Sequence, residues 1–125
     1  MPVVLDAGAL IAIDRSDARV NAILAEARRT GQQLRVPSGV VAQAWRGGSR
    51  QAVLSRMLKT VKEFPLDEEG SRRAGELLKR SNTSDVIDAS VVDLARSGDV
   101  VLTSDLADIE HLARTARKRL LIVSV

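Results

Sequence analysis

Three short stretches of this chain are apolar at every position, and they limit its fold more than any other feature. Residues 3–5, 100–102 and 120–123 read VVL, VVL and LLIV, without the alternation of polar and apolar positions that a half-exposed strand shows. Strands of this kind are typical of a parallel sheet that is covered on both faces by helices. The runs therefore predict an α/β fold.

Helical patterns separate these strands, as a parallel sheet requires. Ser16 is expected to cap a helix whose apolar stripe includes Val20 and Leu24, and Gly31 to end it. The other expected elements are a strand at 34–36, a helix at 40–45, a helix capped by Ser49, an edge strand or extended link at 64–66, a helix capped by Asp67, and helices at 86–95 and 106–116. With 125 residues, of which 45% are hydrophobic, we expect a single domain over residues 1–125, built as a three-layer α/β/α sandwich.

Composition narrows the chemistry. The chain has no cysteine, which excludes disulfides, zinc thiolates and a cysteine nucleophile. No apolar stretch approaches the ~20 residues of a membrane span, so we expect a soluble, cytoplasmic protein. The net charge of +3 fits a polyanionic partner, although solvated helix faces alone could account for it.

Three aspartates stand where chemistry is expected in such a fold. Asp6 follows the first apolar run, Asp105 follows the run at 100–102 after Thr103 and Ser104, and Asp85 opens an apolar helix. In a doubly wound sheet, strand carboxyl ends and the helix N-termini after them share one edge. The three carboxylates should therefore meet, and without a cation they would repel one another.

Two further acids, Asp88 and Asp108, stand three residues after Asp85 and Asp105 and would lie on the same helix faces. Helix capping by the first acid and a favourable dipole interaction of the second would explain each pair in isolation. Capping does not explain why the acids should converge. An oxygen-only ligand set favours Mg²⁺ or Mn²⁺, and such ions support hydrolysis of phosphodiesters.

Four motifs in this order resemble those of the PIN-domain ribonucleases, and especially the VapC toxins of prokaryotic toxin–antitoxin pairs. The likeness covers nearly the whole chain, and the motifs that carry it are VVLDAGAL at residues 3–10, VPSGVVAQAWR at 36–46, DVIDA at 85–89 and VLTSDLAD at 101–108.

The resemblance implies a PIN-like sandwich around a five-stranded parallel sheet, Mg²⁺- or Mn²⁺-dependent endonucleolytic cleavage of RNA, a VapB-like antitoxin as partner, and a homodimer. It implies that Asp6, Asp85 and Asp105 bind metal and that Asp88 and Asp108 are additional acids. It also implies that the hydroxyls of Thr103 and Ser104 lie beside them and can orient a ligand or water. The chain departs from the family at Gln43, where a glutamate is usual. Gln43 can accept a hydrogen bond from a metal-bound water but carries no negative charge.

Two other functions stay open. A non-catalytic PIN-like module would hold RNA or a protein without cutting, and Gln43 is the reason to consider it. A hydrolase with Asp6 as nucleophile would need a second aspartate two residues later, where this chain has Gly8. The particular RNA target is not specified by these motifs.

Overall fold

The computed structural model describes all residues from Met1 to Val125 and contains one five-stranded sheet in which every strand pairing is parallel. The strand order is β3-β2-β1-β4-β5. The strands are β1 (Val3–Leu5), β2 (Leu34–Pro37), β3 (Lys62–Phe64), β4 (Val100–Thr103) and β5 (Leu121–Ser124). The parallel sheet predicted from the apolar runs is confirmed.

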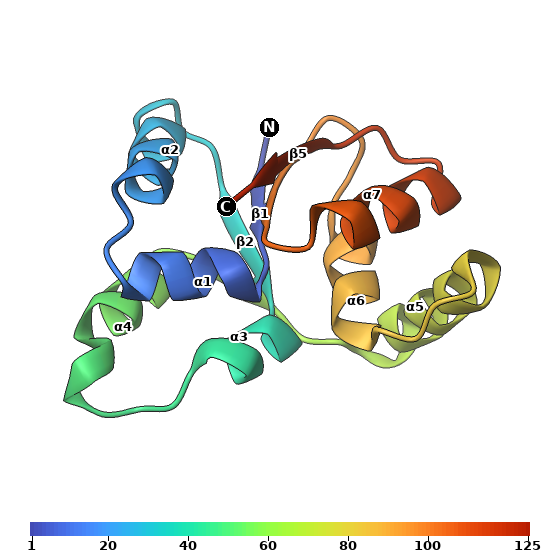
Figure 1. The fold of residues 1–125 in the computed structure, drawn as a ribbon, viewed down its shortest axis with the longest axis horizontal. Coiled ribbons are helices and arrows are strands. Elements are labelled where there is room, and N and C mark those ends of the chain that lie inside the picture. The colour runs from blue at the N-terminus through green and yellow to red at the C-terminus, as the bar shows by residue number, and fades with distance from the viewer.

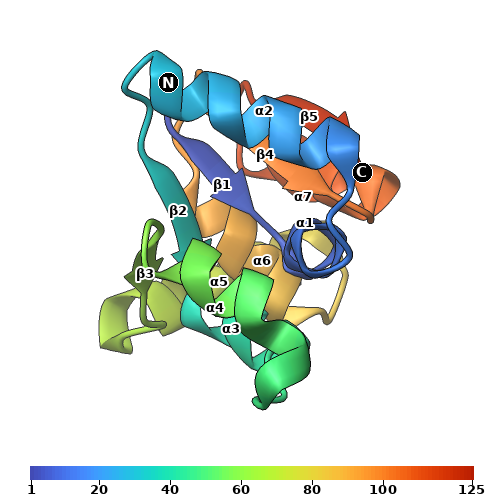
Figure 2. The same ribbon diagram turned by 90° about the vertical axis from the view of Figure 1, so that its left-hand side faces the viewer.

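Helices cover both faces of this sheet, and the two layers come from different halves of the chain (Figures 1 and 2). The first layer holds α1 (Ala7–Asp14), α2 (Ala18–Arg29), α3 (Ser38–Ala44) and α4 (Ala52–Leu58). The second layer holds α5 (Glu68–Ser81), α6 (Val86–Leu94) and α7 (Leu106–Thr115). The predicted three-layer α/β/α sandwich is therefore confirmed.

The strand order reverses at β1, and this places the candidate site. β1 lies between β2 and β4, so the chain leaves β1 toward one side of the sheet and returns later on the other. Open α/β sheets bind ligands in the crevice at such a reversal, beyond the strand carboxyl ends. Asp6 and Asp105 follow the two strands that border this crevice.

The core lies on both faces of the central strands. Val4, Leu5, Val101 and Leu102 are fully buried, and they belong to one cluster of 24 buried residues. Burial on both faces explains why these strands are apolar without alternation. No helix in the structure is both long and apolar enough to cross a membrane.

The cap predicted for α2 was wrong by one residue. Asp17 is the N-cap, and its side chain accepts a hydrogen bond from the backbone N–H of Val20 (3.0 Å). Ser16 instead has a positive φ of 56° in the preceding turn, so it does not have the extended backbone of an N-cap. Gly31 follows the end of α2 with φ 75°, as expected of a helix C-terminus.

Two boundaries around α4 also differ from the prediction. Ser49 begins a 3-10 turn, Ser49–Gln51, and makes no side-chain cap, so α4 starts only at Ala52. The edge strand expected at 64–66 is present as β3 but ends at Phe64, because Pro65 cannot donate to the ladder.

A buried glutamine fixes the connection between α3 and α4. The Nε2 of Gln51 donates to the carbonyl of Ala44 (2.9 Å), and its Oε1 accepts from the N–H groups of Arg46 and Gly47 (2.7 and 2.9 Å). A single side chain therefore satisfies three backbone groups of an irregular segment. This arrangement holds the last turn of α3, which carries Gln43.

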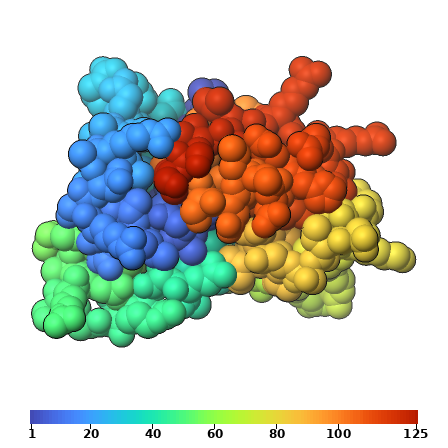
Figure 3. Space-filling model, viewed as in Figure 1, coloured from blue at the N-terminus to red at the C-terminus, as the bar shows by residue number.

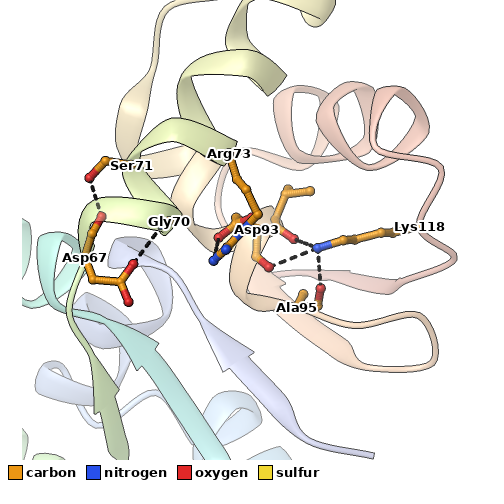
Figure 4. Close-up of polar contacts among 8 residues, drawn as sticks. Asp67, Gly70, Ser71, Arg73, Asp93, Ala95 and Lys118 are labelled. Carbon is orange, nitrogen blue, oxygen red and sulfur yellow. Dashed lines mark hydrogen bonds and ion pairs between the residues drawn. The ribbon is translucent and has the colours of Figure 1, made fainter.

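Lys118 closes the carboxyl end of α6 (Figure 4). Its Nζ donates to the carbonyls of Val92, Asp93 and Ala95 at 2.7–3.0 Å. Burial lowers the pKa of the Lys118 ammonium, and the carboxylate of Asp93 opposes that shift. Nearby, Arg73 makes a two-pronged ion pair with Asp93 (3.0 and 3.2 Å) that joins α5 to α6.

We predict that Lys118→Met lowers the free energy of unfolding by about 2 kcal/mol, because three carbonyls lose a charged donor. Urea denaturation would measure the loss. Lys79→Met, at an exposed position on α5, is the matched control and should change stability little. Equal stability of the two variants would contradict the capping role of Lys118.

Candidate functional site

Asp6 is the most constrained acid at the carboxyl edge of the sheet. Its carboxylate is buried, with 3% of the residue exposed. Oδ1 accepts a hydrogen bond from the N–H of Ala9 (3.0 Å), and Oδ2 accepts one from the N–H of Ser104 (3.1 Å). Asp6 therefore caps α1 and also ties the end of β1 to the turn after β4.

The pKa of Asp6 is raised, chiefly because burial penalises the charged form. Hydrogen bonds from the Thr103 hydroxyl and from the two backbone N–H groups oppose that rise, and the charge of Asp105 adds to it. The carboxylate is thus held in position by donors while its negative charge is poorly solvated.

Gly8 allows the turn after β4 to approach the first turn of α1. A Cβ added at Gly8 would overlap the side chain of Ser104. The main chain next to Asp105 is fixed as well, since the N–H of Asp105 donates to the Thr103 hydroxyl (2.8 Å). The VLTSD motif therefore forms a rigid turn beside Asp6.

Asp85 and Asp88 lie at the start of α6, as the sequence predicted. Asp85 is the N-cap, and its Oδ1 accepts from the N–H of Asp88 (2.9 Å). Asp85 is exposed, whereas Asp88 has only 6% of its surface accessible. Capping accounts for Asp85, but it gives no reason for a buried carboxylate at Asp88.

Asp105 and Asp108 begin α7 in a different way. Asp105 occupies the N-cap position, yet its side chain makes no capping hydrogen bond, and both acids are exposed. The capping explanation therefore fails for Asp105. Its carboxylate is free to bind a ligand.

The charges of these acids converge on Asp88. The pKa of Asp88 is raised to about 7, chiefly by burial and then by the charges of Asp85, Asp105, Asp6 and Asp108, in that order. Each of the other four predicted acids thus lies within electrostatic reach of the buried Asp88 carboxyl. A nearby cation would relieve this repulsion.

Three of the acids, Asp85, Asp88 and Asp108, line one hollow of about 250 Å³ with Thr83, Ser84 and Leu112. Thr83 and Ser84 were not singled out in the sequence, although their place directly before Asp85 was the available signal. No group of three or more acids is close enough together here to form a complete ligand set. The oxygen donors fit Mg²⁺ or Mn²⁺ in type and charge, and the exposed side chains would have to turn inward to bind an ion together.

Gln43 does not join this hollow. It is exposed near the end of α3 and makes no hydrogen bond. Gly39, on the same helix, is where α3 comes against α6, since a Cβ there would overlap Ile87. The helix of Gln43 is therefore beside the helix of Asp88, while the amide itself stays unpartnered.

Comparison with solved structures supports the fold. The chain is similar to a chain in the crystal structure of VapBC2 from Rickettsia felis bound to a DNA fragment from their promoter, with a TM-score of 0.70 and 14% sequence identity. The match covers 98% of this chain and 99% of that one. No protein-family model and no curated protein matches the sequence.

We predict that stability of the metal-free protein falls as pH rises from about 4 to 7. Between the ordinary pKa of 3.8 and the raised pKa of about 7, folded Asp88 keeps a proton that the unfolded chain has lost, so raising the pH favours unfolding. Asp88→Asn should flatten this dependence and raise the melting temperature at pH 8. Thermal unfolding across this pH range in EDTA would measure both effects, and parallel profiles would contradict the raised pKa.

Proposed function

We propose that this chain is the toxin component of a type II toxin–antitoxin system and a metal-dependent endoribonuclease that hydrolyses RNA phosphodiester bonds. The four ordered motifs support this activity, as does the fold shared with a chain of the VapBC2 structure. We further propose that a VapB-like antitoxin neutralises it and that it forms a homodimer.

One observation carries the enzymatic part of the proposal. Four other aspartates raise the pKa of buried Asp88, at the point where the strand order reverses. Such crowding is unfavourable for folding, and active sites are where strongly perturbed carboxylates concentrate. The crowding supports a cation-binding function better than a structural one.

Asp6, Asp85 and Asp105 would hold a Mg²⁺ or Mn²⁺ ion, with Asp88 and Asp108 as further acids beside it. When bound, such an ion lowers the pKa of a water ligand and neutralises charge that develops on the phosphodiester. The protein residues would contribute by holding the ion and the substrate in position. Asp6 is held by two backbone N–H groups, so it can anchor the site without rearrangement.

The remaining groups would act on the ion and the substrate. Asp88 stands beside the proposed ion, whose positive charge would oppose the burial and repulsion that raise the pKa of its carboxyl, so it would act as a carboxylate toward the ion or its water ligands. The hydroxyls of Ser84 and Thr83 line the same hollow and can hydrogen-bond to a ligand there. The backbone N–H of Ser104 already donates to Asp6, so only its exposed side chain would be available to orient a ligand.

A second function, a non-catalytic module that binds RNA or a protein, is favoured by Gln43. Its amide carries no charge and has no partner. Without a carboxylate there, metal affinity would depend on the five aspartates alone. Loss of the glutamate would then leave a binding domain with the fold of a nuclease.

We predict that the purified protein, free of antitoxin, cuts RNA into discrete fragments with Mg²⁺ or Mn²⁺ and not with EDTA. Asp105→Asn should lower the cleavage rate more than about 100-fold, because loss of a residue that merely orients a metal ligand already costs about 10–100-fold. This variant is preferable to Asp6→Asn, since Asp105 makes no capping bond whose loss would unfold the protein.

Glu76→Gln, an exposed position on α5, is the control for loss of one negative charge and should cut at the wild-type rate. Gel analysis of a total RNA preparation, with circular dichroism of each variant, would make the comparison. Metal-independent cutting, or equal rates in Asp105→Asn and wild type, would exclude the proposed site.

We also predict that Gln43→Glu increases metal-dependent cleavage about 10-fold or more by restoring a carboxylate, a gain within the range that ligand-shell changes produce. Cleavage that is absent in the wild type and present in this variant would establish the non-catalytic alternative. An unchanged rate would show that the aspartates suffice.

A further inference from the structure

Four arginines gather at the edge of the sheet opposite the acids. Arg96 stands before β4, Arg114 is in the last turn of α7, and Arg117 and Arg119 are in the segment that leads into β5. We call these four residues the basic surface. In Figure 3, red side chains near the carboxyl end of the chain project from the molecule into solvent.

The side chains of the basic surface have no partners. All four are exposed, and none of their guanidinium groups makes a salt bridge or a hydrogen bond. Some arginines elsewhere are paired, as Arg29 is with Glu26 and Arg73 with Asp93, and others, such as Arg15 and Arg56, are single unpaired charges. Like charges held together without counterions favour the binding of a polyanion.

Neighbouring acids do not neutralise this charge. Asp99 is buried, and its Oδ2 accepts from the backbone N–H of Arg96 (2.9 Å) rather than from a side chain. Glu110 lines an open hollow of about 450 Å³ together with Arg114 and Arg119 but forms no ion pair with either. Arg96 lines a separate hollow with Asp67 and Asp93, so the charge without nearby compensation lies mainly with Arg114, Arg117 and Arg119.

The main chain beneath the arginines is rigid. The N–H of Arg119 donates to the Ser97 hydroxyl (3.1 Å), and the N–H of Gly98 donates to the carbonyl of Arg119 (2.8 Å). Lys118, between the arginines, is anchored on three carbonyls at the end of α6. The four charges are therefore presented from fixed backbone positions.

Arg117 occupies a position where glycine is preferred. Its φ is 56°, in the left-handed region, and it follows the carboxyl end of α7. The N–H of Arg117 bonds to the carbonyl of Arg114, and that of Lys118 to the carbonyl of Ala113, which is the Schellman arrangement of a helix end. The turn does not need a side chain at this position, and the left-handed backbone there is strained for arginine.

Two elements, β4 and α7, connect the basic surface to the edge of the sheet that carries the acids. The four residues of β4 span about 13 Å between Asp99 and Ser104. The ten residues of α7 span about 15 Å from Asp105 back to Arg114 and Ala116. One nucleic-acid strand that lies along α7 could reach both ends at once.

We propose that the basic surface binds the sugar–phosphate backbone of the RNA substrate, in the stretch next to the one held at the acidic edge. The inference rests on the proposed function for the identity of the polyanion. In this proposal the basic surface holds the RNA, a function that the motifs around the aspartates do not provide. Phosphate contacts of this kind position a nucleic acid without reading its sequence.

The test measures RNA binding without cleavage. Anisotropy of a labelled RNA stem-loop is titrated in EDTA over a series of salt concentrations, with wild type, with Arg117→Gln plus Arg119→Gln, and with Arg15→Gln plus Arg56→Gln. The last pair removes the same charge from exposed, unpaired positions in the α1–α4 layer. Loss of two phosphate contacts should reduce the slope of log K against log salt by about 2, whereas the control pair should leave the slope unchanged.

Equal slopes in the two double variants would overturn the proposal, and so would the absence of RNA binding by the wild type in EDTA. RNA binding that is unaffected by the arginine substitutions would overturn it in favour of a partner other than RNA. Because no metal is present, these outcomes do not depend on whether the chain cuts RNA. Absence of cleavage alongside an arginine-dependent slope would refute the enzyme and support the basic surface.

Arg117→Gly separates binding from folding. Glycine relieves the left-handed backbone, so this variant should unfold at a higher temperature than the wild type while its RNA affinity and its salt slope fall. A purely structural residue would move stability and affinity together. A more stable variant with unchanged affinity would remove Arg117 from the proposed contact.

Discussion

The hydrogen bonds of the Asp6 carboxylate are the interaction on which the rest of the site depends. One carboxylate oxygen accepts a hydrogen bond from the first turn of α1, and the other accepts one from the main chain of Ser104. Asp6 and Ser104 are 98 residues apart in sequence, so these bonds fix two distant segments against each other. Gly8 makes this approach possible because it leaves room for the Ser104 side chain. The turn that carries Asp105 is positioned by the same contacts.

The crowding of acids around Asp88 lowers the stability of the fold and favours the binding of a cation. Repulsion and burial keep that carboxyl protonated up to a pH of about 7. The N-termini of α1, α6 and α7 lie at the same edge, and their partial positive charges offset some of the repulsion. The opposite edge carries arginines without partners, so the two ends of α7 differ in charge. Such a separation of charge favours a polyanion at the arginine end of α7 and a cation at the acidic end.

Much of the fold was predictable because burial leaves a direct trace in composition. The uninterrupted apolar runs identified the buried strands β1 and β4, and a stop at Gly31 was confirmed; the third run identified β5, although this edge strand is partly exposed. The errors lie at boundaries, where one polar residue competes with its neighbour. Ser16 and Asp17 are both acceptable caps, and the tight turn after α1 gave the role to Asp17. Ser49 failed as a cap because the segment before α4 is organised by Gln51, a contact between residues that no local pattern reveals.

For the candidate site, the sequence by itself determined which residue types stand at the strand ends and helix starts: Asp6, Asp85, Asp88, Asp105 and Asp108. It also determined that these side chains offer oxygen atoms, the donor type that Mg²⁺ and Mn²⁺ prefer. Only the tertiary structure decided that Asp85 spends an oxygen on capping while Asp105 does not, that Gln43 has no partner, and that Asp88 is the buried member of the group. The physical reason is that side-chain identity is local, whereas burial, hydrogen-bond partners and the sum of neighbouring charges depend on segments far apart in the chain.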